Sequence, residues 1–119
     1  LTVAGAYHSR LMESAQPKLE AALREVVLNL PSVPVISNVT AQTHATGGEI
    51  LNRLVEQVTS PVRWEASIRR LLDEGFTRFI ELGPGTALTG FIRRINRETV
   101  VLNVSNVESL EKTVAALAN

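Results

Sequence analysis

Two histidines are the residues of this chain whose side chains could take up and release a proton near neutral pH. His8 lies in the string GAYHSRLM, just before the first helical pattern, and His44 lies in a loop rich in turn-forming residues. A histidine base in acyl transfer needs a hydroxyl nucleophile within reach and a group that fixes its other ring nitrogen. The chain has no G-x-S-x-G nucleophile motif, and Ser9 is better suited to cap a helix. His8 is therefore either a base whose nucleophile lies elsewhere or a polar residue at a helix start.

The glycine-rich string ELGPGTALTG, which begins at Glu81, is a second candidate site because it connects an expected strand to an expected helix. Such a loop can bind phosphate at a helix N-terminus. A dinucleotide-binding loop would have a third glycine where this chain has Leu88, and Pro84 lacks an N–H donor. Three interpretations stay open: a phosphate site, a tight turn that needs glycine, and a loop beside a site formed by other segments.

Composition excludes several other functions. Twelve Lys and Arg balance twelve Asp and Glu, so no net charge attracts nucleic acid or an anionic membrane. The absence of cysteine excludes disulfides and thiolate metal sites and fits a reducing compartment, so we expect a cytoplasmic protein without a bound metal. No stretch approaches the ~20 apolar residues that cross a bilayer. The chain begins with Leu1 rather than methionine, so we expect it to be a piece of a longer protein.

Hydrophobic periodicity predicts the elements that must position these residues. Apolar residues recur at helical spacing over residues 11–27, 49–58, 62–74 and 109–118, and a further helix is expected to include residues 91–95. Short β-branched runs predict strands at residues 33–39, 78–82 and 99–104. Because Pro17 is tolerated only near a helix start, the first helix should have a separate first turn. Strands that alternate with helices predict an α/β fold with a short parallel sheet flanked by helices.

Four strings extend over most of the chain in a characteristic order: VAGAYHSRLMESA, PVISNVTA, LVEQVTSPVRWEASIRRLLDEG and FIELGPGTALTGFIRRI. Together they resemble the C-terminal part of malonyl-CoA:acyl carrier protein transacylases, from Leu1 to about Asn106. The resemblance implies that residues 1–119 form the C-terminal portion of the large, α/β-hydrolase-like subdomain of an acyltransferase. The N-terminal part with the nucleophile and a small ferredoxin-like subdomain would lie outside the chain. Without the nucleophile, the chain alone is expected to be inactive.

The resemblance also implies roles for individual residues. His8 matches the catalytic base that activates a serine, which takes malonyl from malonyl-CoA and passes it to the phosphopantetheine thiol of acyl carrier protein. Gln57 matches a glutamine whose backbone carbonyl orients that histidine, and Asn38 matches a supporting asparagine close to it. Tyr7 matches an aromatic residue of the acyl pocket that accompanies malonyl rather than methylmalonyl.

Partners follow from the same resemblance. Arg93 and Arg94 match a basic pair that offers a docking surface for the acidic carrier protein. A coenzyme A thioester is expected as substrate, with no bound cofactor, and the rest of the same enzyme is expected to cover this chain. Two other functions stay open: an acyltransferase domain of a polyketide or multifunctional fatty acid synthase, and a non-enzymatic α/β domain that binds a partner.

Overall fold

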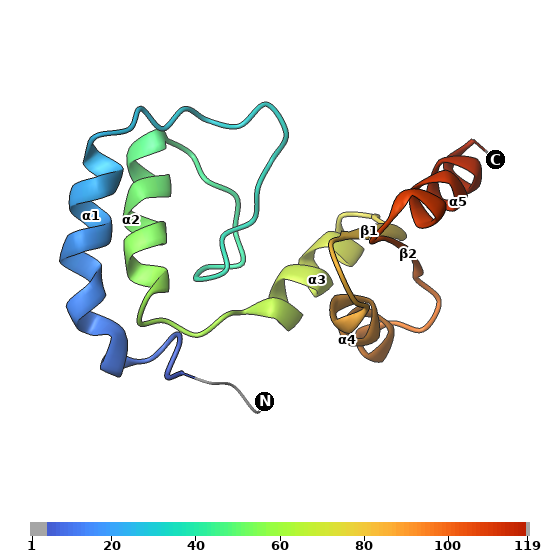
Figure 1. The fold of residues 1–119 in the computed structure, drawn as a ribbon, viewed down its shortest axis with the longest axis horizontal. Coiled ribbons are helices and arrows are strands. Elements are labelled where there is room, and N and C mark those ends of the chain that lie inside the picture. Colours follow the sequence, from blue (N-terminus) through green and yellow to red (C-terminus); the bar gives the residue numbers. More distant parts are fainter. Residues whose placement is uncertain (1–4, 119) are drawn as a thin grey trace. The chain divides into compact units, whose positions relative to one another are not determined.

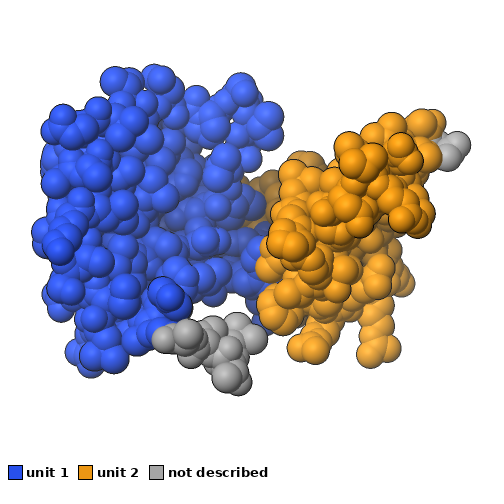
Figure 2. Space-filling view, viewed as in Figure 1, with its two compact units in different colours: residues 1–67 blue, residues 68–119 orange. Residues whose placement is uncertain are grey.

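The computed structural model describes residues 5–118, so the first residues of the string VAGAYHSRLMESA lie outside the described part. The chain divides into two compact units, residues 1–67 and 68–119, which have different colours in Figure 2. His8 and Gln57 lie in the first unit. The glycine-rich loop and the two adjacent arginines lie in the second.

Two helices that lie side by side, α1 (Gln16–Arg24) and α2 (Gly47–Gln57), form the framework of the first unit (Figure 1). A short 3-10 helix, η1 (Arg10–Ala15), precedes α1, and Pro17 lies in the first turn of α1. This break confirms the predicted separate first turn, because proline lacks the N–H that a helix interior uses. Helix α1 ends earlier than the apolar pattern predicts, and the two valines that follow it are exposed.

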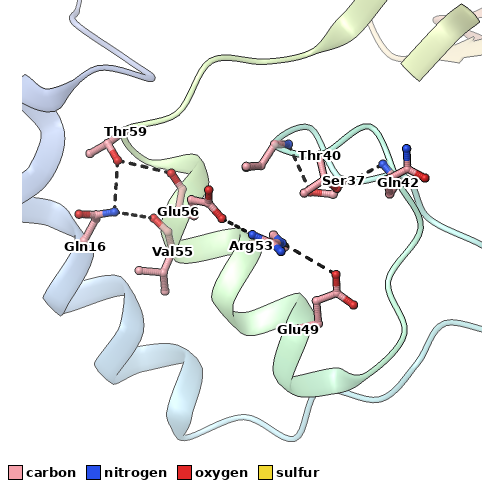
Figure 3. A network of polar contacts seen from close by, with 10 residues as sticks. Gln16, Ser37, Thr40, Gln42, Glu49, Arg53, Val55, Glu56 and Thr59 are labelled. Carbon is pink, nitrogen blue, oxygen red and sulfur yellow. Dashed lines mark hydrogen bonds and ion pairs between the residues drawn. The ribbon is translucent and has the colours of Figure 1, made fainter. Parts of the chain in front are cut away.

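Polar contacts fix α2 in the first unit, as Figure 3 shows. Gln16 donates its side-chain N–H groups to the carbonyl oxygen of Val55 at 3.1 Å and to the hydroxyl of Thr59 at 3.3 Å, which links the start of α1 to the end of α2. Along α2, the Arg53 guanidinium lies 2.6 Å from a carboxylate oxygen of Glu56, in an i,i+3 ion pair. These bonds hold the C-terminal end of α2, where Gln57 lies.

The start of α2 depends on a cap and on a glycine. The hydroxyl of Thr46 accepts a hydrogen bond from the backbone N–H of Glu49 at 3.1 Å, which satisfies one of the free donors of the first turn. At Gly47 a Cβ atom would overlap the backbone carbonyl oxygen of Leu28, which lies beyond the end of α1. Glycine is therefore the residue that allows the two backbones to approach each other here.

The prediction of a strand at residues 33–39 is wrong. The structure has only an isolated antiparallel bridge, which joins Ile36 to Thr43. Between these residues the chain makes a tight turn, in which the N–H of Ala41 donates to the carbonyl of Ser37 at 2.8 Å and Ala41 has a φ of 56°. The chain reverses after a single bridge, so the β-branched residues around it cannot extend into a ladder.

The second unit contains a parallel pair of strands, β1 (Arg78–Leu82) and β2 (Val100–Val104). Helix α4 (Ala87–Ile95) connects them, and α4 and α5 (Val107–Leu117) both pack against β2. Helix α3 (Trp64–Asp73) precedes β1. These elements agree with the predicted helices and with two of the three predicted strands, and the parallel pairing with a crossover helix confirms the α/β class.

Few apolar side chains are buried. In the described part of the chain they are Val39, Ala41, Ile68, Ile92 and Val101, whereas many large apolar residues are exposed, such as Leu82 at 76%. No helix within residues 5–118 is long and apolar enough to cross a membrane.

Candidate active site

The ring of His8 contacts the end of helix α2. Its Nδ1 lies 2.9 Å from the backbone carbonyl oxygen of Gln57, the last residue of α2. The last carbonyls of a helix have no N–H partner within the helix. The Gln57 oxygen accepts from the backbone N–H of Ser60 at 3.3 Å, its second lone pair is available for His8, and the helix dipole adds partial negative charge there. When Nδ1–H donates to this oxygen, Nε2 carries the lone pair that a general base needs. The contact that the resemblance implies is present, while the catalytic role of His8 stays a prediction.

The backbone of His8 is in the left-handed region, with a φ of 58°. Histidine enters this region more often than most residues, but the conformation still costs free energy, and such residues concentrate at functional sites. The hydroxyl of Ser9 donates to the carbonyl of Ala6 at 2.7 Å, which closes a turn around His8. Ser9 occupies the position before η1 that was predicted for a cap, yet its side chain makes no capping hydrogen bond.

An apolar cavity of about 330 Å³ adjoins His8. Besides His8, its lining consists of Tyr7, Met12, Ala15, Leu19 and Val58. The structure therefore brings Tyr7 and the candidate base to one cavity, as an acyl pocket requires, and the role of Tyr7 in selecting the acyl group stays a prediction. The sequence did contain a signal for Met12, because it begins an i, i+3, i+7 helical series. The apolar series that starts at Leu11 does not mark the buried face, because Leu11 is 81% exposed.

Gln57 also lines a second, smaller cavity of about 180 Å³, together with Asn38, His44 and Arg53. Three buried atoms on this lining have no hydrogen-bond partner among the described residues: Nδ1 of His44, Nε of Arg53 and Oε1 of Gln57. The backbone carbonyl of Asn38 accepts from the N–H of Arg63 at 2.8 Å. Within residues 5–118 no hydrogen bond joins Asn38 to His8, so the supporting role of Asn38 stays a prediction.

In the second unit, the protein's own carboxylate closes the glycine-rich loop. Glu81 accepts hydrogen bonds from the backbone N–H groups of Leu88 and Thr89 at 3.1 and 2.9 Å, and from the Thr89 hydroxyl at 2.6 Å. The Thr89 hydroxyl, helped by the two backbone N–H groups, holds the pKa of Glu81 below its ordinary value of 4.5, although burial acts in the opposite direction. A phosphate would use the same N–H groups. The positive φ values of Gly83 and Gly85 and this internal carboxylate favour the tight-turn interpretation of the loop.

Known proteins resemble the chain over almost its whole length. It is 42% identical over 117 residues to the malonyl CoA-acyl carrier protein transacylase of Bacillus subtilis, a match that covers 98% of this chain and 37% of that relative. It is 46% identical over 99 residues to the polyketide biosynthesis malonyl CoA-acyl carrier protein transacylase BaeC of Bacillus velezensis, covering 83% of this chain and 34% of that relative. The crystal structure of acyl-carrier-protein-S-malonyltransferase from Bartonella henselae matches with a TM-score of 0.91 and 35% identity, over 100% of this chain and 38% of that one.

The chain matches malonyl-CoA:acyl carrier protein transacylases in both sequence and fold. It spans little more than a third of the length of these transacylases and corresponds to a C-terminal segment of them. No family model matches it. The structural match to a transacylase agrees with the α/β fold class that the sequence predicts.

Arg93 and Arg94, the basic pair of this transacylase segment, lie in the last turn of α4 and are exposed. The guanidinium of Arg94 lies 6.0 Å from the centre of the Phe91 ring, which is within the range of a cation–π contact. No carboxylate of the described residues forms an ion pair with either arginine, so both charges face solvent. A role in carrier-protein docking stays a prediction.

Proposed function

We propose that this segment supplies the general base of a malonyl transferase. In the full-length protein, a serine attacks malonyl-CoA and the resulting serine ester is attacked by the phosphopantetheine thiol of acyl carrier protein. Nε2 of His8 takes the proton of the serine hydroxyl and gives it to the coenzyme A thiol that leaves. It then takes the proton of the phosphopantetheine thiol and returns it to the serine oxygen when the ester is cleaved. The observation that carries this proposal is the 2.9 Å contact between Nδ1 of His8 and the carbonyl oxygen of Gln57.

A backbone carbonyl can take the place of the aspartate in a serine–histidine–aspartate triad. The triad carboxylate fixes the tautomer and orientation of the imidazole and stabilises the imidazolium that forms. The Gln57 oxygen accepts from Nδ1–H in the same way, and the C-terminus of α2 contributes a partial charge of about −0.5. Transfer through a serine ester needs no bound cofactor, so the coenzyme A thioester enters only as substrate.

The proposal includes the context of the segment. The nucleophile lies in the rest of the enzyme, so the segment alone is inactive and residues 1–119 form part of the large subdomain of the complete acyltransferase. The exposed apolar residues of the segment, Leu82 among them, support the rest of the enzyme as its partner. A chain without cysteine fits the reducing cytoplasm, which we propose as its location.

A second candidate function is malonyl transfer in polyketide biosynthesis, which the 46% identity to BaeC favours. The two candidates differ in the carrier protein that receives malonyl. Transfer rates to a fatty-acid carrier protein and to a polyketide carrier protein, measured side by side, distinguish them.

The base assignment is tested with His8→Ala and His8→Asn in the full-length enzyme. We expect malonyl transfer to carrier protein to fall by about 10⁴–10⁶ in both, because the serine loses its base. Asparagine tolerates the left-handed backbone of His8, so His8→Asn separates lost chemistry from lost folding. Glu13→Ala, at an exposed position of η1, is the control and should retain transfer. Unchanged transfer in both His8 variants would refute the assignment.

A further inference from the structure

Both the backbone and the side chain of Gln57 contact the ring of His8. Nε2 of the Gln57 amide lies 3.0 Å from Nδ1 of His8, the same ring nitrogen that lies 2.9 Å from the Gln57 carbonyl oxygen. Nδ1 carries either a hydrogen or a lone pair in the neutral ring. It can therefore donate to the carbonyl or accept from the amide, but it cannot do both.

The orientation of this amide follows from its other neighbours. Nε2 also lies 3.0 Å from the carbonyl oxygen of Ser60, which can only accept, so the nitrogen end of the amide must face Ser60 and His8. The reversed amide would set two oxygens against each other. The oxygen end, Oε1, is buried and has no hydrogen-bond partner among the described residues. One amide hydrogen is thus directed to Ser60 and the other to Nδ1 of His8.

We propose that the Gln57 side chain is a positioning residue that sets the tautomer of His8. When the amide donates to Nδ1, the ring hydrogen lies on Nε2 and the ring cannot accept a proton from a hydroxyl. When the backbone carbonyl accepts from Nδ1–H, Nε2 is free to act as a base. The amide therefore holds part of the His8 population in the form that cannot act as a base. The catalytic meaning of this competition rests on the proposed function, whereas the tautomer itself is measurable without catalysis.

The test is ¹⁵N NMR of histidine-labelled full-length enzyme at a pH where the imidazole is neutral, with the His8 signals identified by their loss in His8→Ala. We expect the wild-type protein to populate the Nε2–H tautomer. In Gln57→Met, which has a side chain of similar length without an amide, the ring should shift toward Nδ1–H, because the backbone carbonyl remains. Gln57→Leu should show the same shift, which keeps the test decisive if one variant folds poorly.

Gln16→Met is the matched control. It removes an amide that donates to Val55 and Thr59, at the same end of α2, but that does not reach His8. The tautomer of His8 should be unchanged in this variant. If Gln16→Met shifted the His8 tautomer as much as Gln57→Met does, the effect would come from loosening of α2, and the proposal would be overturned.

A kinetic measurement gives the second readout. At low substrate concentration the transfer rate scales with the fraction of enzyme in the competent form. Gln57→Met should therefore raise kcat/KM by the ratio of its Nδ1–H fraction to that of the wild-type protein. A wild-type ring entirely in the Nδ1–H form, or a tautomer unaltered in both Gln57 variants, would overturn the inference. If the tautomer shifts but His8→Ala retains transfer, the inference stands and the proposed function fails.

Discussion

A single oxygen of Glu81, Oε2, accepts two hydrogen bonds from Thr89, one from the backbone N–H at 2.9 Å and one from the hydroxyl at 2.6 Å. A carboxylate of strand β1 thus caps the N-terminus of α4, the helix that crosses to β2. Thr86, at the N-cap position of α4, makes no side-chain capping bond of its own. The turn between β1 and α4 therefore depends on an ionised carboxylate.

Glu81→Gln should destabilise the fold in a pH-dependent way. Because the pKa of Glu81 is lowered in the folded protein, its stabilising contribution is fully present above its ordinary value of 4.5 and is lost as the pH falls through the lower folded value. Glutamine does not titrate. The difference in midpoint denaturant concentration between the two proteins should be largest at neutral pH and should shrink as the pH falls below 4.5. Glu111→Gln, at an exposed position of α5, controls for the lost charge. A constant difference at every pH would contradict the prediction.

Gly47→Ala should destabilise the enzyme by about 1–3 kcal/mol, because the added methyl group overlaps the backbone of Leu28. Gly48→Ala is the control in the same helical turn. Its nearest neighbour lies 4.0 Å from the added atom, so it should stabilise α2 by roughly 0.5–1 kcal/mol. Thermal or denaturant unfolding of both variants measures the difference. Equal effects of the two substitutions would show that the approach to Leu28 does not constrain the fold.

Tyr7→Ser should relax the choice of acyl group. Tyr7 lines the apolar cavity beside His8, and a smaller residue leaves room for an additional methyl group. One methyl group in an apolar pocket changes specificity by roughly 10–200-fold, so the ratio of kcat/KM for malonyl-CoA over methylmalonyl-CoA should fall by up to that factor. Leu11→Ser, at an exposed position outside the cavity lining, should leave the ratio unchanged. If the ratio stays the same in Tyr7→Ser, Tyr7 does not select the acyl group.

Reversal of both Arg93 and Arg94 to glutamate should raise the KM for carrier protein by roughly tenfold, because unpaired positive charges guide an acidic partner. Hydrolysis of the malonyl ester, which needs no carrier protein, should be retained. Arg24→Glu, which reverses one charge at an exposed position of α1, is the control and should leave the KM for carrier protein unchanged. Equal losses of transfer and hydrolysis in the double variant would indicate misfolding.

Local sequence patterns correctly predicted the elements whose own residues favour them, such as strand β1 and the end of the helix before it. Strand β1 coincides with the string RFIEL, and Gly75 ends the helix before it with a φ of 91°, as a helix-terminating glycine should. The strand expected at residues 33–39 has the right composition, but the turn at Ser37 and Ala41 reverses the chain within it. Ser37 and the Asn38 that follows it are turn-forming residue types, so the sequence did contain a signal for this turn, which the β-branched residues around it outweighed.

The site is less predictable from local patterns because its contacts join distant parts of the chain. His8 and Gln57 are 49 residues apart, and only the family resemblance indicated that they meet. The contact of the Gln57 amide with His8 had no signal in the sequence. The same holds for the carboxylate cap by Glu81, since both depend on how side chains are packed after folding.

The division of the chain at residue 67 bears on how such enzymes diversify. Tyr7, His8 and Gln57 all precede this point, and Arg93 and Arg94 follow it. A genetic crossover between codons 67 and 93 therefore exchanges the arginine pair between two parents, while the histidine and the carbonyl that contacts it are inherited together from one of them. Under the roles proposed for these residues, carrier-protein preference and proton transfer can be altered in separate evolutionary steps.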